Sequence, residues 1–158
     1  MEILTTERTY VKGLSTLHDV FLNPIRLTPK HLLLKRSFSV KNEVNNSSKR
    51  IITNEQIAAI FSNVDTLLGF HKEILTSLEE RYKEWNEESK IGDTFLKVAP
   101  FLKMYLIYLN NYDNAMNTLA VCQKQVPFRE FLDTVYKDPR VEGLNIIAYL
   151  LLPVQSMK

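Results

Sequence analysis

The feature that most constrains the fold is a long run of apolar residues, with one histidine among them, spaced alternately by four and three positions. The run consists of Ile57, Phe61, Val64, Leu68, His71, Leu75, Leu78, Tyr82 and Trp85. At about 100° per residue these positions form one stripe along a helix, whereas a half-buried strand would show apolar residues at every second position. The run is longer than an average globular helix, so we expect a kink near Ser62 and Asn63.

Similar patterns predict helices over most of the remaining chain, namely over residues 2–21, 94–99, 101–123, 128–136 and 146–158. Thr53 or Asn54 can cap the long run, and Gln56 can complete a capping box. We expect the first helix to end near Pro24, because proline disfavours helix in the residue before it. We expect the helix over 101–123 to be the most buried, because its first half has apolar residues on both sides. The sequence therefore predicts an all-α protein.

The first predicted helix has two different faces. Its apolar stripe is formed by Ile3, Tyr10, Leu14, Leu17 and Phe21, and a second strip is formed by Glu2, Thr6, Thr9 and Gly13. Short side chains on the second strip let another surface approach closely, and Glu2 can accept hydrogen bonds from that surface. On pattern alone, however, the favoured interpretation is that the second strip is simply solvated.

Composition and motifs exclude several classes of function. The 158 residues are 45% hydrophobic, which suits one domain with a single core, and the net charge of +2 gives no support for nucleic-acid binding. A single cysteine, Cys122, allows no intrachain disulfide and no cysteine-based metal site, and it favours a reducing compartment. The chain has no glycine-rich phosphate loop and no membrane-spanning run, and the pattern of its first residues leads us to expect no secretory signal. We therefore expect a cytoplasmic protein with no catalytic residue, metal or cofactor.

Residues from about 29 to 52 form a basic interruption between the helical segments. Six cations, namely Lys30, Lys35, Arg36, Lys41, Lys49 and Arg50, accompany a single acid, Glu43. Such a loop could bind weakly to anionic membranes and so recruit the protein there, bind an acidic partner, or be phosphorylated at Ser37 or Ser39. Its apolar residues are too scattered to form a membrane face, so a solvated loop or insertion is the favoured interpretation.

Several segments together resemble the Dbl-homology (DH) domain of Rho-family guanine-nucleotide exchange factors. Glu2–Val11 (Glu-Ile-Leu-Thr-Thr-Glu-Arg-Thr-Tyr-Val) matches the opening motif, and Ile60–Leu68 with His71–Leu75 matches the second. Ile91–Lys97, Phe101–Tyr105 and Asn111–Ala115 match the central helices, and Tyr149–Gln155 matches the start of the third motif. The motifs occur in family order over residues 1–158 apart from the basic loop, so together they are more specific than any one of them.

The resemblance implies an elongated antiparallel helical bundle that regulates a Rho-family small GTPase, and through it the actin cytoskeleton, without covalent chemistry. In the family, the residue at the position of Glu2 reaches switch I of the GTPase. The third motif, here Leu152 and Gln155, remodels switch II.

Three further residues of the opening motif, two threonines and its second acid, have roles that the resemblance defines less directly. Thr6 and Thr9 are candidates for GTPase binding only through their place on the helix. Glu7 matches the second acid of the motif but lies near the apolar stripe, so we expect it to pair inside the bundle. We also expect His71 to be a satisfied interior or boundary histidine, because no second ligand with metal spacing accompanies it.

The chain departs from the family in the third motif. Ser156 occupies the position of an arginine, and Met157–Lys158 does not match the Arg-Tyr pair and leucine-rich helix that follow in the family. We therefore expect a DH domain that is incomplete at its C-terminal end, marginally stable and weak in exchange, with an uncovered apolar face that favours self-association. The alternative is a helical adaptor that binds a GTPase or another protein without promoting exchange.

Deleting Lys41 to Ser48 is expected to leave folding intact, because a solvated loop contributes little to the core. Helix content from circular dichroism and the midpoint of thermal unfolding should both match those of the full chain. A deletion that lowers the helix content would contradict the interpretation of this segment as a loop.

Overall fold

The computed structural model describes residues 2–27, 50–86, 92 and 101–156, and every regular element within them is helical. In order they are α1 (Glu2–Thr16), the π-helical segment η1 (Leu17–Leu22), α2 (Asn23–Leu27), α4 (Asn54–Phe61), α5 (Val64–Lys83), α7 (Leu102–Cys122), α8 (Val126–Val135), the 3-10 segment η3 (Pro139–Val141) and α9 (Ile146–Gln155). Residues 28–49, which include most of the basic loop, and the predicted helix over 94–99 lie outside the described residues. At the end of the predicted loop, Ile51 and Ile52 are buried in the core.

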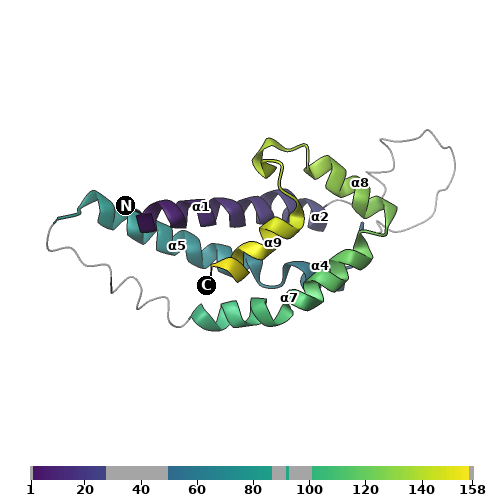
Figure 1. The fold of residues 1–158 in the computed structure, drawn as a ribbon, viewed down its shortest axis with the longest axis horizontal. Helices are drawn as coiled ribbons and strands as arrows, with labels where there is room; N and C mark the ends of the chain where they lie inside the picture. Colours follow the sequence, from purple (N-terminus) through teal and green to yellow (C-terminus); the bar gives the residue numbers. More distant parts are fainter. Residues whose placement is uncertain (1, 28–49, 87–91, 93–100, 157–158) are drawn as a thin grey trace.

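The helices form an elongated bundle (Figure 1). α1 lies antiparallel to α5, α4 packs on α7, and α9 packs on both α1 and α7. The predicted helices over 101–123, 128–136 and 146–158 correspond to α7, α8 and α9. The prediction of an all-α, elongated bundle is confirmed.

The first helix continues past Pro24, so the prediction that it ends there is wrong. Asn23, the residue before the proline, keeps α-helical torsion angles, and its N–H donates to the carbonyl of His18, five residues earlier. The wider turn of η1 gives the proline ring room that a regular α-helical turn would deny it. Ile25, one residue later, is fully buried and holds α2 against the core.

The long apolar run forms two helices, α4 and α5, so the kink predicted near Ser62 and Asn63 is a complete break. Ser62 adopts a left-handed φ of 48°, and the side-chain amide of Asn63 donates to the carbonyl of Met104 at 2.9 Å. This hydrogen bond joins the break between α4 and α5 to α7. At the start of α4, both hydrogen bonds of the predicted capping box between Thr53 and Gln56 are present.

Aromatic and aliphatic side chains from all the helices fill the core. Phe21, Phe61 and Phe128 are fully buried, and each contributes about 1.5–3 kcal/mol relative to an exposed side chain. A smaller apolar cluster, in which Leu4 of α1 meets Phe70 of α5, lies apart from the main core.

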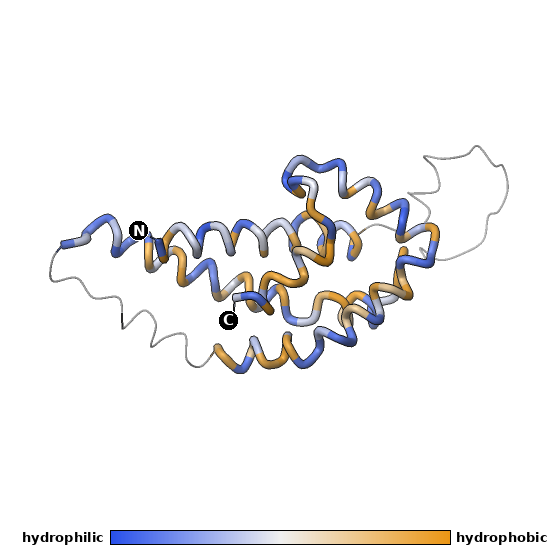
Figure 2. The backbone as a smooth tube through the Cα atoms, viewed as in Figure 1, coloured by the Kyte–Doolittle hydropathy of each residue, from blue (hydrophilic) through white to orange (hydrophobic). Residues whose placement is uncertain are grey.

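Two predictions about burial are wrong. Ile3 is 45% exposed, and the neighbouring Leu4 is buried in its place. α7 is not the most buried helix, since Leu106 and Ile107 are 53% and 57% exposed. In the described part of the chain α7 forms one edge of the bundle (Figures 1 and 2). Its packing partners α4, α5 and α9 all lie on the side of α7 that faces the bundle.

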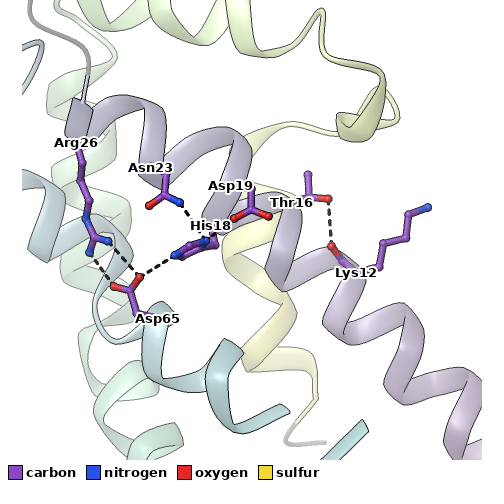
Figure 3. Close-up of polar contacts among 7 residues, drawn as sticks. All are labelled: Lys12, Thr16, His18, Asp19, Asn23, Arg26 and Asp65. Atoms are coloured by element: carbon purple, nitrogen blue, oxygen red, sulfur yellow. Dashed lines mark hydrogen bonds and ion pairs between the residues drawn. The ribbon is translucent and has the colours of Figure 1, made fainter. Parts of the chain in front are cut away.

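A polar cluster on the surface joins α2 and η1 to α5 (Figure 3). Arg26 donates two hydrogen bonds to the carboxylate of Asp65, at 3.1 and 2.7 Å. His18 Nε2 lies 3.0 Å from the same carboxylate. The Arg26 guanidinium lowers the pKa of Asp65, although partial burial acts in the opposite direction.

Asp65→Asn is expected to destabilise the protein by about 1 kcal/mol or less, because the pair is largely exposed to solvent. The lowered pKa of the folded state means that this stabilisation is present at neutral pH and is lost as the pH falls through the folded-state pKa. Urea unfolding should therefore show a difference from wild type that shrinks in acid. Asp113→Asn, at an exposed site on α7, is the control, and a difference that ignores pH would contradict the assignment.

Candidate functional site

A groove of about 650 Å³ lies between α1, α5, α9 and the start of α7. It is lined by Ile3, Thr5, Thr6, Glu7, Thr9, Tyr10, His71, Ile74, Leu78, Leu102, Tyr105, Leu152, Gln155 and Ser156. Residues from the two ends of the sequence therefore share one concave surface, which combines aliphatic side chains with a few hydrogen-bonding groups.

Four of the five residues predicted to bind a GTPase line this groove. Thr6 and Thr9 are exposed on α1, Gln155 is exposed at the end of α9, and Leu152 is half-buried. Glu2, the fifth residue, is exposed in the first turn of α1, one helical turn before Thr6, and does not line the groove. The structure thus brings four of the candidates together and leaves Glu2 beside them.

Gly13 lets α9 approach α1 closely. A Cβ atom at this position would lie 2.5 Å from Cδ1 of Leu152. Gly13 was predicted to belong to a strip that admits another surface, and at this point the other surface is α9 of the same chain.

Glu7 and His71 form a largely buried hydrogen-bonded pair in the lining of the groove. The Glu7 carboxylate lies 2.6 Å from His71 Nδ1, and the two side chains are 15% and 9% exposed. The other ring nitrogen, Nε2, forms a hydrogen bond with the hydroxyl of Tyr105. The predictions that Glu7 pairs inside the bundle and that His71 is a satisfied interior histidine are confirmed.

Hydroxyl groups extend this pair as far as the end of α9. The Tyr105 and Tyr10 hydroxyls lie 3.2 Å apart, and the Tyr10 hydroxyl lies 3.4 Å from Oγ of Ser156. The Ser156 hydroxyl also donates to the carbonyl of Pro153 at 2.9 Å. Burial raises the pKa of both Tyr10 and Tyr105, so both hydroxyls keep their protons at neutral pH. Sequence reasoning missed this connection, because periodicity carries no signal for contacts between residues so far apart.

The described residues contain few groups arranged for covalent or metal chemistry. Among them, no three His, Cys, Asp or Glu side chains are placed to hold a metal ion. Burial raises the pKa of the Cys122 thiol, which disfavours the nucleophilic thiolate. The helices of the described ranges are too short or too polar to cross a membrane. The groove combines aliphatic side chains with exposed hydrogen-bonding groups, a combination that is also found in surfaces between proteins.

Comparison with known proteins identifies relatives over nearly the whole chain. A family model described as the RhoGEF domain matches residues 1–157. The Myosin-M heavy chain of Dictyostelium discoideum is 32% identical over 157 residues, which are 99% of this chain and 8% of that protein. Human FYVE, RhoGEF and PH domain-containing protein 4 is 33% identical over 158 residues, which are 99% of this chain and 18% of that protein. The chain therefore spans less than a fifth of the length of these two curated relatives.

Solved structures share the fold. The linker-DH/PH domains of p115-RhoGEF match with a TM-score of 0.75 and 24% identity, covering 99% of this chain and 43% of theirs. A structure of the Vav1 exchange factor with its PH and C1 domains matches with a TM-score of 0.74 and 18% identity, covering 98% of this chain and 36% of its own. At these identities the likeness shows the fold, which is the helical bundle of DH domains.

Gly13→Ala is expected to gain little stability, although alanine normally stabilises a helix interior by about 1 kcal/mol relative to glycine. The reason is that the new methyl group meets Leu152, so the same substitution should recover the gain when Leu152→Ala is also present. Gly69→Ala in α5 is the matched control, because nothing lies within 4 Å of a Cβ there. Urea unfolding measures the coupling, and additive effects at positions 13 and 152 would contradict the close contact.

Proposed function

The chain belongs to the RhoGEF domain family, and from this membership we propose that it binds a Rho-family small GTPase through the groove and the exposed first turn of α1. One observation carries the proposal: Thr6 and Thr9 of α1 share the groove with Leu152 and Gln155 of α9. Two helices from opposite ends of the sequence can therefore contact one partner. Glu2 lies one helical turn from Thr6 on the same side of α1, where the partner can also reach it.

The α1 side of this surface is proposed to meet switch I of the GTPase. The exposed carboxylate of Glu2 can accept charge-assisted hydrogen bonds, which are roughly twice as strong as neutral ones. Thr6 and Thr9 have short side chains, so the partner's backbone can come close to the helix at these positions. Glu7 takes no direct part, because its carboxylate is occupied by His71.

The α9 side is proposed to meet switch II. The exposed side-chain amide of Gln155 can both donate and accept hydrogen bonds. Leu152 contributes packing without charge. Ile3 and Leu102 also line the groove and are 45% and 46% exposed, which supplies the apolar centre typical of protein interfaces.

Nucleotide exchange depends on the difference between two affinities of the exchange factor. A factor accelerates release of GDP only if it binds the nucleotide-free GTPase better than the loaded one. We propose that the 158 residues assayed alone exchange weakly, since Ser156 stands where the family carries an arginine. The same substitution favours the second candidate function, a helical adaptor that binds the GTPase without promoting exchange.

The apolar lining of the groove also supports self-association of the chain, which would compete with binding of the GTPase. Leu106, one helical turn after Leu102 of the groove, is also exposed, as is the neighbouring Ile107. Recruitment to anionic membranes through the basic loop concerns cations that, apart from Arg50, lie outside the described ranges, and it stays a prediction from the sequence.

Glu2→Ala is expected to weaken binding to a nucleotide-free Rho-family GTPase about tenfold or more, because a hydrogen bond to a charged group contributes about 1.5–3 kcal/mol. Isothermal titration calorimetry against a panel of Rho-family members measures the loss. Glu73→Ala is the matched control, since it removes an exposed carboxylate of α5 outside the groove and should leave the affinity unchanged.

Release of a fluorescent guanine nucleotide, measured with the same proteins, separates the two candidate functions. Tight binding of the nucleotide-free GTPase without faster release supports the adaptor. If the 158 residues accelerate release as well as a complete DH domain does, the proposal of weak exchange is wrong. If no member of the panel binds, the docking proposal itself is wrong.

A further inference from the structure

We infer that the outer face of α7 is the interface of a two-fold symmetric dimer, in which α7 packs antiparallel on α7 of a second copy of this chain. This α7 face consists of Lys103, Leu106, Ile107, Asn110 and Asp113, which are all exposed and do not line the groove. The inference gives self-association a specific surface, and it does not depend on binding of a GTPase.

The α7 face carries few charges for an exposed helix surface. Lys103 and Asp113 are the only acidic or basic residues of α7, which has 21 residues. The 20 residues of α5, by contrast, include Asp65, Lys72, Glu73, Glu79, Glu80, Arg81 and Lys83. Leu106 and Ile107 are 53% and 57% exposed, and α7 forms an edge of the described bundle, so a partner can reach them (Figure 1). Exposed aliphatic side chains with few charges around them are typical of the centre of a protein interface.

The exposed residues of α7 follow a heptad spacing. Lys103, Leu106, Asn110, Asp113 and Asn117 are separated alternately by three and four positions, and all five are exposed. Such a stripe repeats every 3.5 residues on average, so it stays on one side of a helix and suits packing against a second helix. An asparagine within a stripe of this kind fixes the register in which two helices pack. Asn110 occupies such a position.

The two charges make the α7 face complementary to itself in one orientation. In a two-fold symmetric interface every contact occurs twice, once from each copy. Lys103 and Asp113 are ten positions apart, which is about 15 Å along the helix. When two copies of α7 run antiparallel about an axis level with Tyr108, Lys103 of each copy lies opposite Asp113 of the other. A parallel pairing would place like charges opposite each other, which is unfavourable.

The same register brings the aliphatic residues together. Leu106 of one copy lies level with Asn110 of the other, and Ile107 lies close to the axis, where it meets Ile107 of the second copy. The overlap covers only residues 102–114 of each copy, so we expect a weak dimer with a dissociation constant between about 10 µM and about 1 mM. At the low micromolar concentrations of an unfolding measurement this dimer is dissociated, so Asp113→Asn remains a valid control there.

Sedimentation velocity of the complete 158-residue chain tests the inference. Between about 5 µM and about 500 µM the average mass should rise toward that of a dimer. Leu106→Ser should weaken self-association about tenfold, because each dimer loses two apolar side chains from its centre. Val121→Ser is the matched control, since Val121 is 53% exposed on the same helix but lies beyond the overlap. A chain that stays monomeric up to about 500 µM, or that responds equally to both substitutions, overturns the inference.

Charge reversal tests the register. Lys103→Glu and Asp113→Lys should each weaken self-association about tenfold, because each variant places two like-charged pairs across the axis. A mixture of the two variants should associate as strongly as wild type, since both pairs of the mixed dimer again join opposite charges. The double variant Lys103→Glu/Asp113→Lys should recover in the same way. Without recovery in the mixture and in the double variant, the antiparallel register is wrong.

Two comparisons keep the α7 face separate from the groove and from the proposed function. Ile3→Ser alters an exposed apolar residue of the groove and should leave the dimer intact. Self-association that is lost with Ile3→Ser and survives Leu106→Ser would place the interface at the groove and refute the inference. If the chain dimerises as expected and no GTPase of the panel binds, the dimer stands and the docking proposal fails. If a GTPase binds and the chain stays monomeric, docking stands and the dimer is refuted.

Discussion

The arrangement of the bundle depends on how it satisfies one histidine in its interior. An unpartnered buried polar group costs about 1–3 kcal/mol, and His71 avoids this cost through Glu7 of α1 on one side and Tyr105 of α7 on the other. Apolar packing is not directional, whereas a hydrogen bond has a preferred distance and angle. The ring on α5 therefore fixes the rotation of two neighbouring helices that apolar stripes alone would leave less well defined.

α9 is anchored unequally along its length. Its first half is deeply buried through Ile146, Tyr149 and Leu150, and the Tyr108 hydroxyl bonds the carbonyl of Leu150. Its last turn ends in exposed Gln155 and Ser156, where few polar contacts act. The residues proposed to meet switch II lie in this more weakly held half.

The helices themselves could be predicted from the sequence because their signals are local. The apolar spacing located α4 and α5, and the side chains of Thr53 and Gln56 marked a start that the structure reproduces. The predictions that are wrong concern residues whose structure is decided by tertiary contacts. Pro24 stays helical because a π-turn and a buried Ile25 outweigh its local preference. The exposed side of α7 carries the same apolar pattern as a buried one, and a pattern does not say whether a partner covers it.

The site could be predicted only in part, for the same reason. Helix geometry and family resemblance singled out Thr6, Thr9, Leu152 and Gln155, which the fold gathers at one groove. The pairing of Glu7 with His71, and its extension to the end of α9, depends on contacts between distant segments. This connection bears on the proposed function, because a surface shared by two helices binds tightly only while they keep their relative position. Any partner that must distinguish two states of a GTPase needs such a surface to be held in place before binding, since ordering it afterwards would consume part of the affinity difference.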